Sequence, residues 1–158
     1  MGFIIPSRED TIMTFTSRAT ALAAALTLSA TLAFADPAAK VAIHVDEDNV
    51  QTMNMALNNA ANIAKHYADL EQEVVIEIVT YGPGVHMLRQ DTSPVKDRIS
   101  TMSLELDNIQ FSVCLNTVQA MEQKAQTDVP LVSEAVEVPS GAVRLMELQY
   151  DGYAYLRP

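Results

Sequence analysis

Two runs of consecutive apolar, mostly β-branched residues constrain the fold most strongly. Residues 41–45 read VAIHV and residues 74–81 read VVIEIVTY, with little alternation between apolar and polar positions. Strands with one solvated face alternate, whereas strands covered on both faces are apolar throughout. The two runs therefore predict buried strands of a parallel sheet.

The segment between these runs has helical periodicity. Its apolar residues recur at spacings of three and four and are Val50, Met53, Leu57, Ala60, Ala64 and Tyr67. This spacing places them on one face of a helix, with Asp48 or Asn49 as the expected N-cap. A strand followed by a helix and a second strand is the repeating unit of a parallel sheet.

The rest of the chain continues this alternation. Ser93-Pro94 is expected to open a helix with Ser93 as its cap. The other expected elements are a strand at 108–114, a helix capped by Asn116, a short strand at 135–138, a helix capped by Ser140 and a strand at 153–156. The pattern predicts one α/β domain with a mostly parallel sheet of about five strands.

The inward face of the last helix is predicted from its apolar spacing. Val143, Met146 and Tyr150 are three and four residues apart and are expected to pack on the sheet.

Residues 13–35 have the pattern of a secretory signal peptide. Arg18 is followed by an uncharged Ala/Leu-rich run to Phe34, and Ala33-Phe34-Ala35 fits an A-x-A cleavage site. The run is shorter than the ~20 strongly apolar residues of a transmembrane helix. We therefore expect residues 1–35 to be an N-terminal extension and signal peptide that is removed, leaving residues 36–158 as a single periplasmic domain. Translation from either Met1 or Met13 is compatible with this pattern.

The charge balance excludes several classes of partner. The 158 residues include 20 acidic and 10 basic side chains, for a net charge of −10. Nucleic acids and anionic lipids both bind basic surfaces, so we expect no nucleic-acid partner and no membrane attachment after signal cleavage. A single cysteine excludes an intramolecular disulfide.

Polar and reactive side chains follow three of the predicted strands. His44 and Asp46 close the first, His86 follows the loop after the second, and Cys114 ends the third. Right-handed crossovers bring the carboxyl ends of parallel strands to one edge, where ligands bind near the point at which strand order reverses. These side chains are therefore expected to converge.

Cys114 is the first candidate for a chemical role. It lies two residues before Asn116, the expected N-cap, so the amides and positive end of that helix would face the sulfur. Such surroundings lower a thiol pKa and favour the nucleophilic thiolate. The alternative is a small, buried apolar residue, as most free cysteines are.

The remaining candidates would bind substrate. His44 is either a core histidine or a ligand contact, and His86 is a base, a ligand contact or a surface residue. Arg89 would hold an anion or pair with a nearby aspartate. The candidate substrate-binding residues are His44, Asp46, Gly82, Gly84, His86, Arg89 and Asn116. No metal site and no cofactor are expected, because close ligand pairs, a dinucleotide fingerprint and a P-loop are absent from the sequence.

Four segments together resemble the DsrE/DsrF-like family, in particular its exported single-domain members. The segments are VAIHVDEDN from residue 41, EIVTYGPGVHMLRQDTSPVKDRI from residue 77, FSVCLNT from residue 111 and VPSGAVRLMELQYDGYAYLRP from residue 138. The resemblance covers residues 40–158. It implies a flavodoxin-like three-layer fold assembled as a homotrimer or homohexamer.

The resemblance also implies a function. Active members carry a cysteine after the third strand, the position of Cys114, and it accepts sulfane sulfur as a persulfide. The expected partners are a small sulfur-donor molecule or a sulfur-relay protein. The leading hypothesis is a periplasmic sulfur carrier or weak sulfurtransferase. The alternatives are an oligomeric, non-catalytic binding module with an unreactive cysteine, and a metal-binding protein that uses His44 and His86.

Overall fold

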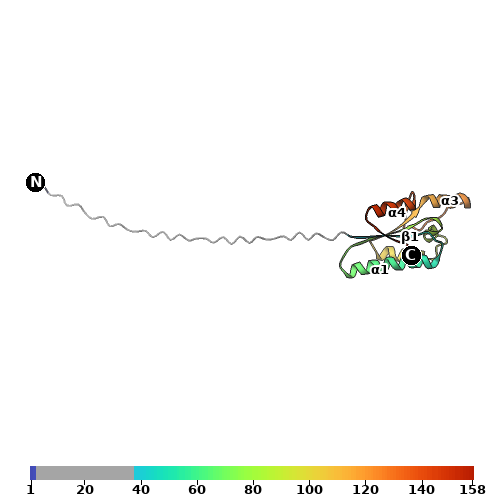
Figure 1. Cartoon of the computed structure of the whole chain (residues 1–158), viewed down its shortest axis with the longest axis horizontal. Helices are drawn as coiled ribbons and strands as arrows, with labels where there is room; N and C mark the ends of the chain where they lie inside the picture. The colour runs from blue at the N-terminus through green and yellow to red at the C-terminus, as the bar shows by residue number, and fades with distance from the viewer. Residues whose placement is uncertain (3–37) are drawn as a thin grey trace. The chain divides into compact units, whose positions relative to one another are not determined.

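The computed structural model describes residues 1–2 and 38–158 (Figure 1). The predicted signal peptide and its cleavage site after Ala35 lie outside these residues. Among the described residues, none of the helices has both the length and the hydropathy needed to cross a membrane.

Strands and helices alternate along residues 39–156, as the sequence predicts. The elements are β1 (Ala39–Val45), α1 (Val50–Asp69), β2 (Val74–Thr80), the 3-10 helix η1 (Gly82–Leu88), α2 (Lys96–Glu105), β3 (Ile109–Cys114), α3 (Leu115–Ala125), β4 (Ala135–Val138), α4 (Gly141–Tyr150) and β5 (Ala154–Leu156). The five strands form one sheet in the order β4-β3-β2-β1-β5, and every pairing is parallel. The predicted α/β class and strand number are confirmed, and the arrangement is consistent with a flavodoxin-like three-layer fold.

Helices cover both faces of the sheet. Figure 1 shows α1 and α4 on opposite sides of β1. On the α1 side, a large apolar core joins alternate residues of β1, β2 and β3 to α1, α2 and η1. On the α4 side, a small cluster joins Ala42 and Val79 to Leu145 and Leu148. Burial on both faces explains why β1 and β2 read as continuous apolar runs.

Two of the four predicted helix caps are confirmed. The side chain of Asn49 accepts hydrogen bonds from the amides of Gln51 and Thr52 at the start of α1. Ser140 caps α4 by accepting from the amide of Val143.

The other two predicted caps are wrong. Helix α2 begins only at Lys96, because Ser93 and Pro94 belong to the turn before it. The Ser93 hydroxyl donates to the carbonyl of Met87 at 2.5 Å and so ties this turn to η1. Asn116 lies inside α3, whose N-cap residue is Cys114. No loop separates β3 from α3, so the helix starts two residues earlier than predicted.

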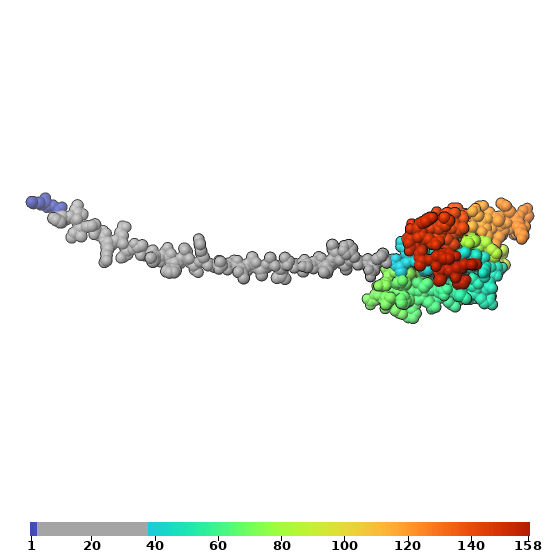
Figure 2. All heavy atoms as spheres, in the orientation of Figure 1, coloured from blue at the N-terminus to red at the C-terminus, as the bar shows by residue number. Residues whose placement is uncertain are grey.

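The predicted inward face of α4 is also wrong. Its buried residues are Gly141, Leu145 and Leu148, whereas Val143, Met146 and Tyr150 are 50%, 53% and 83% exposed. The helix carries two apolar stripes of similar periodicity, and spacing alone does not decide which one packs on the sheet. In Figure 2, residues of α4 (red) form part of the visible surface.

Candidate functional site around Cys114

The end of β3 lies where the chain leaves neighbouring strands toward opposite faces of the sheet. After β3, α3 packs through Val118 into the core on the α1 side. After β4, α4 packs through Leu145 and Leu148 into the cluster on the other side. Such a switch point between adjacent parallel strands is where ligands bind in open α/β sheets. Cys114, the last residue of β3, is located at this point.

Hydrogen-bond donors surround the sulfur of Cys114. Burial raises the pKa of this thiol, since the side chain is almost fully enclosed. The Thr117 hydroxyl and the backbone amides of Gly141, Thr117 and Asn116 more than offset burial and hold the pKa below its ordinary value. Although the Cys114 side chain makes no N-cap hydrogen bond, the lowered pKa means that these donors favour the thiolate.

The amides come from two helices. Asn116 and Thr117 lie in the first turn of α3, and Gly141 is the first residue of α4. The first turns of two helices therefore lie beside one sulfur, and each carries the partial positive charge of a helix N-terminus. The Asn116 amide also donates to the carbonyl oxygen of Pro139 at 3.3 Å. A sulfur anion is the species that this arrangement stabilises.

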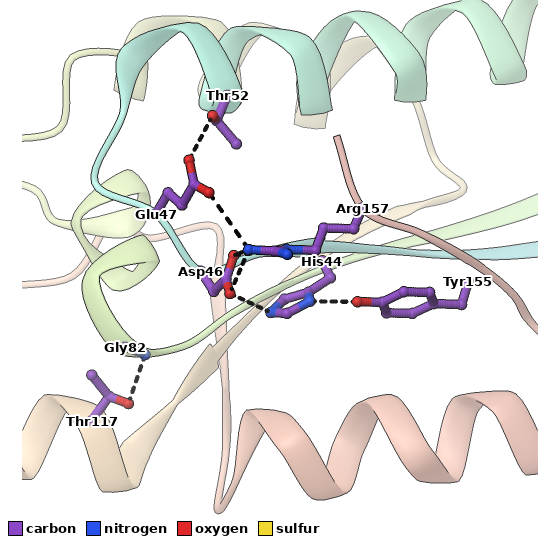
Figure 3. Close-up of polar contacts among 8 residues, drawn as sticks. All are labelled: His44, Asp46, Glu47, Thr52, Gly82, Thr117, Tyr155 and Arg157. Carbon is purple, nitrogen blue, oxygen red and sulfur yellow. Dashed lines mark hydrogen bonds and ion pairs between the residues drawn. The ribbon is translucent and has the colours of Figure 1, made fainter.

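Thr117 connects the site to the loop after β2. Its hydroxyl oxygen accepts a hydrogen bond of 3.1 Å from the amide of Gly82 (Figure 3), which leaves the hydroxyl proton for the sulfur. Gly82 has a φ of +52°, a conformation that favours glycine. Gly84 is needed for packing, because a Cβ there would lie 2.2 Å from the carbonyl oxygen of Val45. Gly82 thus lets the loop approach Thr117, and Gly84 lets it approach the end of β1.

His44 and Asp46 belong to a polar cluster at the end of β1 (Figure 3). His44 Nδ1 is 2.7 Å from the Tyr155 hydroxyl, and Arg157 holds both carboxylate oxygens of Asp46. His44 Nε2 is buried without a hydrogen-bond partner, 3.8 Å from Asp46 Oδ2. Burial lowers the pKa of His44 more than Asp46 raises it, so the ring favours its neutral form.

A tyrosine lies between this cluster and the cysteine. The ring of Tyr81 stacks on His44 at a centroid distance of 4.6 Å. A Cβ added to Gly141 would lie 2.9 Å from the Cβ of Tyr81 and 3.2 Å from that of Cys114. His44 is therefore connected to Cys114 through packing: its ring stacks on Tyr81, and Gly141 packs against both Tyr81 and Cys114.

His86 and Arg89 lie beside a separate groove. The groove has a volume of about 440 Å³, and its other lining residues are Asp48, Gly82, Pro83 and Met121. His86 Nδ1 contacts Asp48 Oδ1 at 2.5 Å, and Arg89 forms a two-point ion pair with Asp91. The bond from Arg89 lowers the pKa of Asp91 to about 2. Both basic groups are thus already paired with carboxylates.

The two histidines have different partners in the structure. His44 pairs with Tyr155 and His86 with Asp48. Within residues 1–2 and 38–158, no three His, Cys, Asp or Glu side chains are grouped as metal ligands.

The sequence analysis missed several residues of the site. They are Tyr81, Thr117, Gly141, Tyr155 and Arg157. Tyr81 is the last residue of a predicted strand, and Thr117 and Gly141 each directly follow a predicted helix cap, so their positions at a strand end and at helix starts were the available signal. Tyr155 and Arg157 each contact residues 111 positions away, a pairing for which the sequence carries no local signal.

Comparison with known proteins identifies the family. Residues 3–158 match the model of the DsrE/DsrF-like family. The chain belongs to this family. A solved structure of a protein of unknown function from Methanobacterium thermoautotrophicum is 32% identical, with a TM-score of 0.64. The match covers 76% of this chain and 99% of that one. A comparison with curated proteins finds no match.

Proposed function

We propose that this DsrE/DsrF-like protein is a periplasmic sulfur carrier that holds sulfane sulfur as a persulfide on Cys114. The observation that carries the proposal is the convergence of donors from two helices on one cysteine at the switch point of the sheet. A thiolate is the form of cysteine that attacks sulfur, and the surroundings of Cys114 favour that form.

Loading requires a single displacement and no cofactor. The Cys114 thiolate attacks the outer sulfur of a persulfide donor, R–S–SH. A new S–S bond forms on Cys114 while the S–S bond of the donor breaks, and R–S⁻ leaves with the electron pair. The product, Cys114–S–SH, transfers its outer sulfur to an acceptor thiolate by the same step. The donors around position 114 would then stabilise the thiolate that is regenerated.

The partners of this carrier follow from charge and from exposed apolar surface. A chain of net charge −10 offers no basic surface for transfer RNA, which favours a small sulfur donor or a sulfur-relay protein. The exposed stripe of Val143, Met146 and Tyr150 on α4 is apolar surface that a monomer rarely leaves open. We assign it to contacts between copies in a homotrimer or homohexamer.

Intact mass spectrometry tests the proposal directly. Protein from the periplasmic fraction is incubated with hydropolysulfide, and its mass is measured before and after reduction. We expect a satellite about 32 Da heavier that disappears on reduction and is absent from Cys114→Ser. Equal loading of Cys114→Ser, or a parent that stays unmodified, would refute the carrier. The same spectrum tests export, since the proposed mature chain begins at Asp36.

The burial of Cys114 favours a second candidate, a non-catalytic binding module. Only 5% of the residue is exposed, which restricts the access of a donor to the sulfur. This candidate predicts a cysteine that is inert to alkylation in the folded protein, whereas the carrier predicts rapid alkylation at neutral pH. The rate with iodoacetamide, compared with that of free cysteine, separates the two.

A further inference from the structure

An ion pair between a buried glutamate and a half-buried arginine ties α4 to the centre of the sheet. Arg144 donates from Nε to Glu77 Oε1 at 2.8 Å and from Nη2 to Oε2 at 2.7 Å. The Glu77 side chain is 3% exposed. Ser112 donates to Glu77 Oε1 at 2.6 Å, and Gln110 in turn donates to the Ser112 hydroxyl. The carboxylate is therefore fully bonded between β2, β3 and α4.

Such a pair contributes little net stability. Removing two charges from water costs roughly what their mutual attraction returns, and apolar replacements are often as stable. The pair does fix geometry, because a two-point guanidinium–carboxylate contact has one preferred orientation. We therefore expect the pair to matter more for the position of α4 than for the free energy of unfolding.

The apolar cluster beneath helix α4 is small. It consists of Leu145 and Leu148 against Ala42 and Val79, with the partly buried Tyr81 and Tyr153 packed against these four residues. The second apolar stripe of α4 is exposed. Because this cluster is small, we expect the Glu77–Arg144 contact to be important for aligning α4 on β2 and β3.

Arg144 lies one turn after Gly141, which contacts Cys114. Residues three apart lie on the same side of a helix, so the ion pair acts on the turn whose first amide faces the sulfur. That turn tolerates little displacement, because Gly141 already sits against Tyr81 and Cys114 with no room for a side chain.

We propose that Glu77 and Arg144 are positioning residues that hold the N-terminal turn of α4 against Cys114. The pair acts through Gly141 and does not touch the reacting sulfur. The proposal rests on the proposed function for the use made of the thiolate, but the formation of the thiolate can be measured without any sulfur donor.

The test replaces the pair by apolar residues of similar size. Glu77→Leu combined with Arg144→Met removes both charges together, so no unpaired carboxylate remains to repel the thiolate. We expect the double variant to stay folded but to unfold at a lower denaturant concentration than the parent, because the buried Ser112 hydroxyl loses the carboxylate to which it donates. We also expect its alkylation at pH 7 to be about tenfold slower, with the pH–rate profile displaced to higher pH, as loss of one hydrogen bond to a charged group implies.

Two further variants complete the design. Arg144→Lys keeps the charge but loses the two-point contact, and we expect an intermediate rate. Arg98→Gln is the matched control, since Arg98 binds Asn54 and Asn58 on the opposite side of the sheet. Its pH–rate profile should equal that of the parent.

The outcomes separate this proposal from the proposed function. A folded double variant with the parent's pH–rate profile would overturn the positioning role, whatever sulfur loading shows. A displaced profile in a protein that never accepts sulfur would support the positioning role and refute the carrier.

Discussion

Gly141 lies so close to Cys114 that a methyl group at position 141 would come within 3.2 Å of the cysteine Cβ. The first residue of α4 and the last residue of β3 are thus in direct contact, although 26 residues separate them in the chain (141 − 115 = 26). The contact brings the N-terminus of α4 to Cys114, which is already the N-cap residue of α3. We therefore expect the reactivity of Cys114 to depend on this glycine, which the sequence analysis did not single out.

Gly141→Ala should slow alkylation of Cys114 and destabilise the fold. The added Cβ would also meet Tyr81, at 2.9 Å from its Cβ, so α4 must shift and its first amide must leave the sulfur. We expect a loss of about 1–3 kcal/mol in the free energy of unfolding, as for other overpacked sites. Urea denaturation and the alkylation rate at pH 7 measure the two effects.

The control for this substitution is Ala142→Ser, at the next and exposed position of α4. It should change neither quantity. If Gly141→Ala alkylates as fast as the parent, the amide of Gly141 does not contribute to the thiolate.

Thr117→Val should raise the pKa of the Cys114 thiol. The substitution keeps the shape of the side chain but removes the hydroxyl that donates to the sulfur and accepts from Gly82. Loss of one hydrogen bond to a charged group predicts alkylation about tenfold slower at pH 7. A pH–rate profile with iodoacetamide measures the shift.

Thr117→Ser retains the hydroxyl and should restore most of the rate. If the pH–rate profiles of Thr117→Val and Thr117→Ser are equal, packing at position 117, rather than the hydroxyl, determines how this residue affects the pKa of Cys114.

Much of the fold could be predicted because local physics determined it. The apolar runs of β1 and β2 are buried on both faces, and the three–four spacing of α1 matches its buried side. The caps at Asn49 and Ser140 act within three residues, so local sequence suffices to predict them. The family resemblance added the layer structure.

Other features depend on tertiary contacts that no local pattern contains. Two stripes of α4 have helical spacing, and the sheet packs the one with Leu145 and Leu148. The junction at Cys114 has no loop, so the cap moved from Asn116 to the cysteine itself. The topology argument predicted that the side chains at the strand ends would converge, and His44 and Asp46 do lie in one cluster. His86 instead lies beside a separate groove, where it and Arg89 pair with aspartates.

His44 should make stability depend on pH. Burial lowers its pKa below the ordinary value of 6.5, whereas the unfolded chain has no such burial. Below about pH 6.5 the unfolded state therefore binds more protons, and the stability that the neutral ring contributes is lost as pH falls toward the folded pKa. For one proton the slope is at most about 1.4 kcal/mol per pH unit.

Urea denaturation between about pH 5 and pH 8 measures this dependence. His44→Asn keeps a polar atom near the Tyr155 hydroxyl but cannot titrate, so its stability should fall less on acidification than that of the parent. His66→Asn, at an exposed position of α1, is the control and should follow the parent. A parent slope retained in His44→Asn would assign the dependence to other groups.

Met146→Glu should reduce the oligomeric state without unfolding the chain. Met146 lies between Val143 and Tyr150 on the exposed stripe of α4, and a charge buried there between copies would be unpaired. Sedimentation equilibrium should show the parent as a trimer or hexamer and the variant as a smaller species with the parent's helical circular dichroism.

Leu104→Glu, at an 84% exposed position of α2, should leave the assembly intact. A monomeric parent, or dissociation by Leu104→Glu but not by Met146→Glu, would contradict an interface at α4. Because α4 also supplies the amide of Gly141, dissociation that slowed alkylation as well would link assembly to the reactivity of Cys114.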